Sequence, residues 1–391
     1  MKNMIYYLKK YGTTSFAEMP FNEVDSLILS QFGYLNLDLF INHPHDEVFL
    51  KDVINKKNAH DLAYASMTRK DNEKFCSAFE KTFRYDLIYF KHLVSEINYV
   101  KCEQFFAVSF FLKDFIYISY RGTDLTLAGW QEDVNMSYLE TVPAQNSALE
   151  YLKNVYNLYK KPMIIGGHSK GGNLALYAAM KAEKEIQDMI LDVYDFDGPG
   201  FSNKEVFKSE GYLNIKDKLH IVSSTMSVVA LLLFNPDKIE FLKTSGFTVL
   251  QHNPFNWHVK GNKLIRVKRN SITSRYLEKS VSRFFSIVGY GDRRRFFNLL
   301  FFIAKDHPKS SLLDVKRHPI RYFIGAKNRR KTLDKEDIVF LKYIKKTIRI
   351  SFTSSLKQDK KDNKKLKIEQ NIENNKENNL VLNNMEVKGN E

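Results

Sequence analysis

The sequence has few cysteines, and this shortage excludes whole classes of protein. Only Cys76 and Cys102 occur in 391 residues, which is too few for a disulfide framework and favours a reducing compartment. Neither cysteine is surrounded by residues with metal-ligand spacing. We therefore expect neither a metal ion nor a cofactor.

Long apolar runs are also missing. The longest are "VVALLLF" at 228–234 and "FFNLLFFIA" at 296–304, whereas a membrane-spanning helix needs roughly 20 residues. The first residues, "MKNMIYYLKKYGTTSF", contain no apolar stretch typical of a signal peptide. These absences predict a soluble cytoplasmic protein that contacts a membrane, if at all, only at its surface.

Positive charge is abundant but unevenly placed. The chain has 60 Lys and Arg against 45 Asp and Glu, a formal net charge of +15. Residues 261–350 hold 24 of the basic and 7 of the acidic residues, for a net charge of +17, whereas residues 1–260 are close to neutral at about −3. The charge pattern thus separates a neutral region from a basic one.

Three regions follow from composition and charge. Residues 1–260 are expected to form the main domain with helices at its N-terminus, and residues 261–353 a basic helical segment that packs on it. From about residue 354 the chain consists mostly of Lys, Asn, Glu and Asp. Such a segment buries too little apolar area to offset its ordering entropy, so 354–391 is predicted to be a disordered tail.

Hydrophobic periodicity predicts helices and a hairpin in the first half of the chain. Helical spacing occurs at 21–35 and again at 72–94, and a further helix is expected at 144–161. Between them, the β-rich runs Phe105–Leu112 and Phe115–Tyr120 are joined at Lys113-Asp114, which is typical of a β-hairpin.

Strands and helices then alternate. Short strands are expected at 162–167, 189–196 and 218–224, with a helix at 173–185 after the first of them. Alternation of this kind predicts an α/β fold with a mostly parallel sheet and helices on both of its faces.

One short segment has the form expected for a nucleophile. Gly167-His168-Ser169-Lys170-Gly171 fits the pattern G-x-S-x-G, with a strand before it and a helix after it. The glycines allow a sharp turn that projects the Ser169 hydroxyl above the sheet, and the following helix points its amides at the reacting carbonyl. The alternative is a glycine-rich turn that only packs a helix on a sheet.

A second segment resembles the oxyanion loop of the class 3 lipases. Arg121-Gly122-Thr123 follows a strand and precedes Trp130 and Asp133. Together with "GHSKGGNLALYAA", "YDFDGPGF" and "QHNPFNW", it resembles a bacterial α/β-hydrolase family of unknown function related to those lipases. The resemblance implies an oxyanion hole made by the amides of Lys170 and Thr123, with the Thr123 hydroxyl as a third donor.

The base should follow the nucleophile in the chain. His252 is the first choice because it ends a strand-like run, opens the turn "HNPF" and lies where the resemblance places the base. His258 is the next candidate, and His220 looks structural. The histidines after Ser169 are His220, His252, His258, His307 and His318.

The acid is where the chain departs from the class 3 lipase pattern. Those lipases carry Asp-x-Val after the next strand, and this chain has Ser227-Val228-Val229 instead. Asp197 is preferred because it ends the strand that follows the elbow helix, although it would equally serve to cap the turn at 198–200. Asp237 is the alternative, Asp195 alternates with Asp197 along the strand, and a Ser–His dyad would remain if no acid serves.

These observations predict a serine hydrolase that cleaves carboxylic esters, with acyl lipids as the expected substrates. The basic segment is expected to contact anionic lipid, through an interfacial helix at 293–302 that could instead be buried or cover the site. No nucleic-acid-binding motif accompanies the charge. The alternative function is an inactive α/β-hydrolase fold that binds a membrane or a partner.

Overall fold

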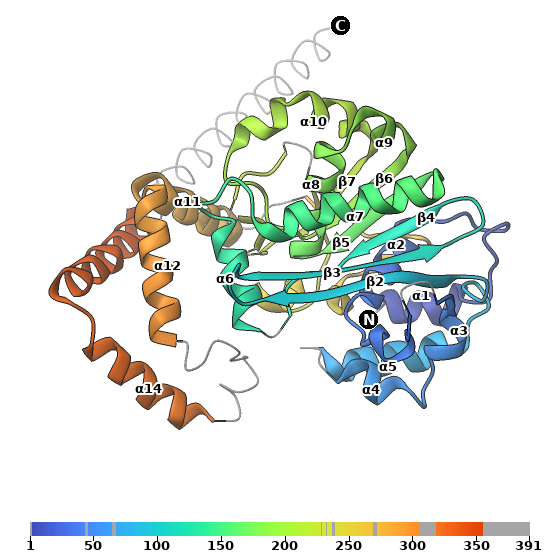
Figure 1. Ribbon diagram of the computed structural model, residues 1–391, viewed down its shortest axis with the longest axis horizontal. Helices are drawn as coiled ribbons and strands as arrows, with labels where there is room; N and C mark the ends of the chain where they lie inside the picture. The colour runs from blue at the N-terminus through green and yellow to red at the C-terminus, as the bar shows by residue number, and fades with distance from the viewer. Residues whose placement is uncertain are drawn as a thin grey trace, which may run out of the picture.

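The protein is built around an eight-stranded sheet (Figure 1). The computed structural model describes residues 2–43, 46–64, 68–124, 126–227, 229–231, 233–236, 239–268, 272–304 and 318–354. The strands follow one another across the sheet in chain order. They are β1 (Val48–Phe49), β2 (Tyr89–Asn98), β3 (Glu103–Phe111), β4 (Ile116–Tyr120), β5 (Met163–His168), β6 (Ile190–Phe196), β7 (Leu219–Ser224) and β8 (Glu240–Leu242).

The sheet has an antiparallel half and a parallel half. Strands β1 to β4 pair antiparallel, and the predicted hairpin is confirmed as β3 and β4. From β4 to β8 every pairing is parallel. This arrangement confirms the predicted α/β class, and it brings the carboxyl ends of β4, β5, β6 and β7 to one edge of the sheet.

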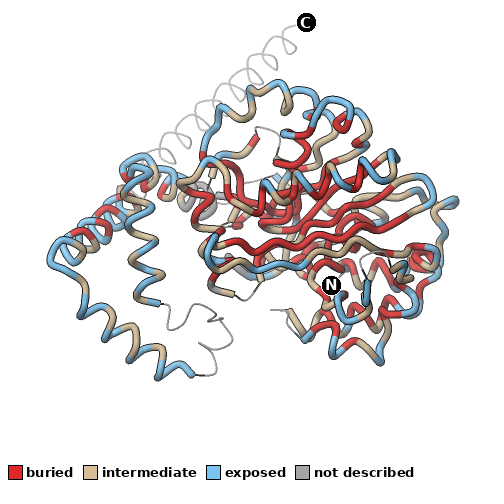
Figure 2. Tube along the Cα trace, viewed as in Figure 1, coloured by how far each residue is buried: buried red, intermediate tan, exposed pale blue. Residues whose placement is uncertain are grey.

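Helices cover both faces of the sheet, which is why β3 and β4 are buried along their whole length (Figure 2). Phe106, Val108 and Phe110 of β3 pack with the N-terminal helices, whereas the alternate residues Phe105 and Ala107 pack with α7 and α8. Successive side chains of a strand point to opposite faces. The continuous apolar run in β3 thus reflects burial on two sides.

One layer consists of the N-terminal helices α1 (Met4–Tyr11), α2 (Glu23–Phe32), α3 (Leu50–Val53), α4 (Ala59–Ala63) and α5 (Arg69–Phe79). The other contains α7 (Pro143–Tyr159), α8 (Lys170–Lys181), α9 (Lys184–Met189) and α10 (Glu210–Ile215). At the carboxyl edge lies α6 (Leu127–Asn135). The remaining short elements are the 3₁₀ helices η1 (Leu37–Phe40), η2 (Lys204–Lys208), η3 (Lys216–Lys218), η4 (Val229–Leu231), η5 (Thr248–His252) and η6 (Pro254–Asn256), and the hairpin of β9 (Val259–Lys260) and β10 (Lys263–Leu264).

The helix prediction at 72–94 is wrong in its second half. Helix α5 ends at Phe79, and residues 89–98 form β2. There Tyr89 stacks on Phe111 of β3, with ring centroids 5.0 Å apart. Pairing with β3 over eight residue positions outweighs the local helical spacing, as tertiary context commonly does. The helices predicted at 21–35 and 144–161 are confirmed as α2 and α7.

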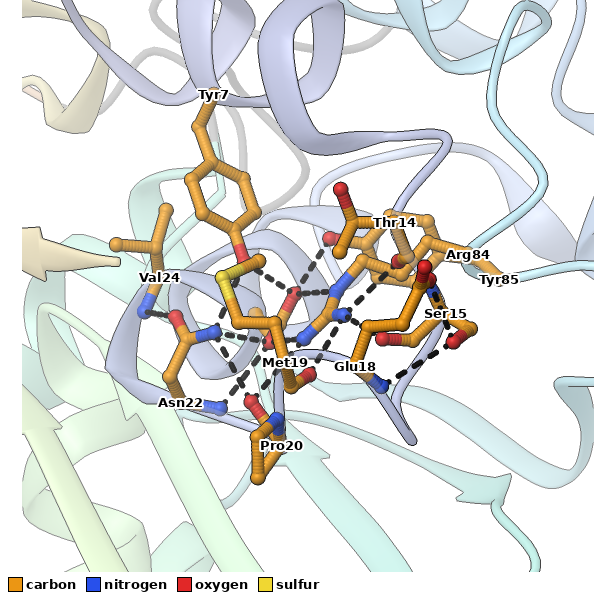
Figure 3. Close-up of polar contacts among 11 residues, drawn as sticks. Tyr7, Thr14, Ser15, Glu18, Met19, Pro20, Asn22, Val24, Arg84 and Tyr85 are labelled. Carbon is orange, nitrogen blue, oxygen red and sulfur yellow. Dashed lines mark hydrogen bonds and ion pairs between the residues drawn. The ribbon is translucent and has the colours of Figure 1, made fainter. Parts of the chain in front are cut away.

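A buried ion pair ties the N-terminal helices together (Figure 3). Arg84 Nη2 lies 2.6 Å from Asp25 Oδ2, and both side chains are fully buried. The hydroxyl of Tyr85 donates to Asp25 as well, and Arg84 donates to the carbonyls of Thr14 and Met19. Because both charges are saturated with hydrogen bonds, this cluster is structural, and it joins the first turn of α2 to the loop after α1 and to the segment before β2.

Among the described residues, four helical stretches follow β10 and project from the edge at which α6 lies (Figure 1). They are α11 (Ile272–Ile287), α12 (Tyr290–Ala304), α14 (Pro319–Lys331) and residues 335–354. Phe284, Val288, Phe340 and Ile344 form a small apolar cluster of their own. The region is helical as predicted, while the boundary at 260/261 stays a prediction and the expected tail at 354–391 lies, from residue 355 on, outside the described residues.

None of the helices in the described part of the chain is both long and apolar enough to cross a bilayer.

Candidate active site

Ser169 lies in a strained turn between β5 and α8. Its backbone angles are φ 59° and ψ −135°, a region that non-glycine residues rarely occupy. A Cβ atom on Gly171 would come within 2.1 Å of the Tyr120 carbonyl oxygen, and one on Gly167 within 2.4 Å. The two glycines of the motif are therefore required for α8 to approach β4 this closely, as the nucleophile-elbow interpretation expects.

The Ser169 hydroxyl is available for chemistry. The residue is half-buried, and no hydrogen bond within the described part of the chain uses its side-chain oxygen. Its amide, by contrast, donates to the carbonyl of Phe196 at 2.9 Å. The backbone of the elbow is thus bonded to the residue that directly precedes Asp197.

Asp197 and His252 form a hydrogen-bonded pair at the same edge. Nδ1 of His252 lies 2.7 Å from Oδ2 of Asp197. The Asp197 side chain is fully buried, whereas 23% of the His252 side chain is exposed. A carboxylate only accepts, so Nδ1 carries the proton and Nε2 keeps its lone pair. His252 thus has the tautomer of a general base.

Two residues of β7 also donate hydrogen bonds to the Asp197 carboxylate. Its other oxygen, Oδ1, accepts hydrogen bonds from the Ser223 hydroxyl at 2.5 Å and the Ser224 amide at 3.2 Å. Asp197 also has a positive φ of 59°, a conformation in which Asp is tolerated. The carboxylate is therefore oriented toward His252 by β7, and the turn-capping role expected for Asp197 falls instead to Asp195, whose Oδ1 accepts from the Gly198 amide.

Two backbone amides on segments next to Ser169 have no hydrogen-bond acceptor among the described residues. Lys170 is the first residue of α8, so its amide has no acceptor within the helix. In the loop after β4, the amides of Arg121, Gly122 and Asp124 donate to Phe106, Tyr34 and Gln104. Of these four consecutive amides, only that of Thr123 has no acceptor among the described residues, which suits an oxyanion donor.

Two adjacent acidic residues of α6 hold the side chains of these oxyanion candidates. The Thr123 hydroxyl donates to both oxygens of Asp133, at 2.6 and 2.5 Å. The Lys170 ammonium lies 2.7 Å from Glu132 Oε2, and both charged groups are buried. The expectation that the Thr123 hydroxyl acts as a third oxyanion donor therefore needs correction, because Asp133 already accepts its proton.

Burial changes the pKa of Asp133, which accepts the hydrogen bond from the Thr123 hydroxyl. Desolvation raises the pKa of Asp133 to about 6, opposed by the nearby Lys170 charge and by the Thr123 hydrogen bond. Asp133 therefore lies close to its titration point at mildly acidic pH.

Tyr34 and His168 join the loop after β4 to the backbone of His252, and the sequence analysis did not single out either residue. The Gly122 amide donates to the Tyr34 hydroxyl at 3.1 Å, and that hydroxyl lies 3.0 Å from Nδ1 of His168. His168 Nε2 in turn lies 2.8 Å from the carbonyl oxygen of His252, to which it donates. The pKa of His168 is well below its usual value because of burial and, secondarily, the nearby His252.

The other histidines lie away from this cluster or outside the described residues. His220 pairs with Asp192 at 2.6 Å, and His258 with the Ser245 hydroxyl at 2.7 Å. His318 is exposed at the start of α14. His307 and the alternative acid Asp237 fall outside the described residues.

Asp195 points into the protein beside α8, with Gly172 close to its carboxyl group. Desolvation raises its pKa to about 8, so it is mostly protonated at neutral pH and does not contact His252.

No group of three or more potential metal ligands comes together in the part of the chain that the structure describes.

One protein-family model matches part of the chain. The family model described as Mbeg1-like matches residues 79–302, which include Ser169, Asp197 and His252. No curated protein matches the chain.

Similar solved structures include the native propeptide complex of Rhizomucor miehei lipase. It is 14% identical, with a TM-score of 0.35, and the match covers 56% of this chain and 66% of that chain. M37 lipase is 13% identical, with a TM-score of 0.29 and coverage of 46% and 68%. The chain thus spans slightly less than two thirds of the Rhizomucor lipase chain.

Proposed function

The chain belongs to the Mbeg1-like family, and we propose that it is a serine hydrolase that cleaves carboxylic esters. The observation that carries this proposal is the His252–Asp197 hydrogen bond, made at the edge of the sheet where Ser169 occupies its strained turn. Nucleophile, base and acid then follow in the chain order expected for this fold.

The proposed reaction uses only side chains and amides of this chain. Ser169 Oγ attacks the ester carbonyl while His252 Nε2 takes the hydroxyl proton, and Asp197 stabilises the resulting imidazolium. His252 then gives the proton to the departing alcohol, which leaves an acyl group on Ser169. Water, activated by the same histidine, releases the acid and restores the serine.

Oxyanion stabilisation is assigned to the amides of Lys170 and Thr123. Both amides lack an acceptor in the described structure, so each can donate to the negative oxygen without breaking an existing bond. One such donor contributes on the order of 3 kcal/mol to the transition state. Because α6 holds both side chains, the donors are positioned before the substrate arrives.

Acyl lipids are the proposed substrate class. Large apolar side chains are exposed on segments next to the site residues: Trp130 on α6 (40%), Phe234 beside Phe201 (51%), and Phe247 and Leu250 near His252 (61% and 58%). Such side chains favour a ligand with hydrocarbon. A hydrophilic ester would gain little from them.

A fluorophosphonate probe tests the proposal. Wild-type protein should be labelled on Ser169, and Ser169→Ala should not be labelled. Ser202→Ala is the matched control for labelling, because the Ser202 hydroxyl donates to the Leu139 carbonyl and is not part of the proposed site. If the wild type is not labelled under conditions where a known lipase reacts, the proposal of a serine hydrolase is wrong.

A further inference from the structure

The helices at 319–350 expose an unusual number of large apolar side chains. On α14 they are Ile320, Phe323 and Ile324, with exposed fractions of 74%, 72% and 52%. Residues 335–354 add Ile338, Val339, Tyr343, Ile348 and Ile350. Large contiguous apolar patches on a protein surface usually mark a contact with a membrane or a partner.

Helix α14 has no fully buried residue along its 13 positions. Its half-buried residues Tyr322, Gly325, Ala326 and Arg329 lie on one side, from which Arg329 contacts α12. Ile320, Phe323 and Ile324 are spaced three and four residues apart and therefore share one face. Lys327 and Lys331 continue that face toward the C-terminal end of the helix, and both are exposed. The face is thus apolar in its first half and basic in its second.

The helices that carry this face are attached beside the candidate active site. Arg293 at the start of α12 donates to the carbonyl of Ser137, just after α6, at 3.0 Å. The Tyr290 hydroxyl donates to the carbonyl of Ser202, in the loop that follows Asp197, at 3.0 Å. Arg329 of α14 donates to the Ile303 carbonyl of α12 at 3.0 Å, so α14 is linked to the site through α12.

We propose that this face of α14 docks on a bilayer that contains anionic phospholipid. Ile320, Phe323 and Ile324 enter the boundary between headgroups and acyl chains, and Lys327 and Lys331 contact the anionic headgroups. This inference rests on the proposed function, because the docking serves to bring lipid esters to Ser169.

The net charge of the region around α14 favours an anionic bilayer as the partner that binds this face. Residues 261–350 carry a net charge of +17, and residues 351–391 about +1. A second copy would place this positive region against a like one, and the last residues of the chain offer no opposite charge. An anionic bilayer supplies both negative charge and an apolar layer.

Arg293 and Arg295 are unsuitable for testing lipid binding, because both have structural contacts. Arg293 is committed to the carbonyls of Ser137 and Val288, and Arg295 forms an ion pair with Asp337 at 2.8 Å. Replacing Arg293–Arg295 would therefore detach α12 from the core as well as remove charge. The face of α14 makes no such contacts through Lys327 or Lys331 within the described residues.

Vesicle flotation tests the proposal with the full chain carrying Ser169→Ala, so that no lipid is consumed. The probes are vesicles of pure phosphatidylcholine and of equimolar phosphatidylcholine and phosphatidylglycerol. Binding is expected only to the anionic vesicles. Lys327→Glu with Lys331→Glu should lower the partition coefficient about thirtyfold or more, since each basic residue near an anionic surface contributes roughly fivefold.

The apolar half is tested separately. Ile320→Ser, Phe323→Ser and Ile324→Ser together should lower binding at least about tenfold. The matched controls are Phe83→Ser with Leu87→Ser, exposed by 71% and 83% at a site away from α14, and Lys56→Glu with Lys57→Glu, also exposed. Both control proteins should bind like the wild type.

Three outcomes would overturn the proposal. They are equal binding to neutral and anionic vesicles, α14 variants that bind like their controls, and a dimer in solution that only the α14 variants dissociate, which would make the face a self-association surface. Flotation does not depend on catalysis. Loss of probe labelling at Ser169 would therefore refute the hydrolase proposal and leave the docking result standing.

Discussion

The Lys170 ammonium and the Glu132 carboxylate form a buried ion pair next to the candidate nucleophile. Nζ of Lys170 lies 2.7 Å from Oε2 of Glu132 and 2.8 Å from the Gln104 carbonyl oxygen. The Ala144 amide donates to the other Glu132 oxygen. The side chain that follows Ser169 is therefore bonded to α6, to β3 and, through Glu132, to the start of α7.

Replacing Lys170 with Met should destabilise the fold. It leaves the Glu132 carboxylate buried without its cation, and breaking a buried pair typically costs about 3 to 5 kcal/mol. The free energy of unfolding, from urea denaturation, checks this. Lys181→Met at the exposed end of α8 is the control, and adding Glu132→Gln to Lys170→Met should recover part of the loss. Equal stability of Lys170→Met and the control would contradict the finding.

Asp197→Asn should abolish most of the esterase activity without unfolding the protein. The amide no longer holds His252 in the tautomer with a free Nε2, and such a change costs about 10⁴ in kcat in serine hydrolases with a Ser-His-Asp triad. Hydrolysis of a short soluble p-nitrophenyl ester measures it. Asp195→Asn is the matched control because it lies two residues earlier on the same strand without contacting His252. Equal losses in both variants would exclude Asp197 as the acid.

Thr123→Val should reduce kcat by less than about tenfold. Its hydroxyl donates to Asp133 rather than to the substrate oxygen, so the substitution removes positioning but leaves the backbone donor. Loss of a direct oxyanion donor would cost about 10² to 10³. Steady-state kinetics on a soluble ester distinguish the two, and a loss of the larger size would restore the hydroxyl as a third donor. Thr126→Val, in the same loop, is the comparison.

Tyr34→Phe should lower kcat more than it raises KM. The variant leaves the Gly122 amide without its acceptor and His168 without its hydroxyl partner, so the oxyanion loop and the His252 backbone lose their connection. Misplacement of a reacting group by about 1 Å can cost 10²-fold. Kinetics with a soluble ester measure the effect. Tyr11→Phe, on α1, serves as the control, and an unchanged kcat in Tyr34→Phe would show that the connection is not needed.

Asp195 should make the wild type less stable as the pH rises. Its pKa is about 8 in the folded protein against an ordinary value of 3.8, so between these values the folded state binds more protons than the unfolded state. The contribution present below pH 3.8 is thus lost as the pH rises toward 8, by at most about 1.4 kcal/mol per unit. Asp195→Asn removes this dependence, and urea denaturation across the window compares the two proteins. Parallel curves would contradict the raised pKa.

The sequence alone was sufficient for features that depend on neighbouring residues. The turn at Ser169 follows from glycines within two positions of it, which the close approach to Tyr120 requires. The hairpin of β3 and β4 follows from two β-rich runs joined by a tight turn. Local patterns of this kind report backbone freedom and burial, and both are properties of short segments.

The helix expected at 72–94 shows where local pattern fails. The same apolar residues fit the spacing of a helix and also fit a strand that pairs with a long neighbouring strand. Only the partner strand β3 decides that residues 89–98 are extended.

The partners of the site residues were decided by the tertiary structure. Asp197 and His252 lie 55 positions apart, and Tyr34 and His168 lie 134 apart, so no periodicity connects them. Parallel pairing of β5, β6 and β7 brings Asp197 beside the elbow, and burial on both faces of the sheet then forces each polar group at that edge to find a partner. Residue types at the site were visible in the chain, but which of them meet depends on that packing.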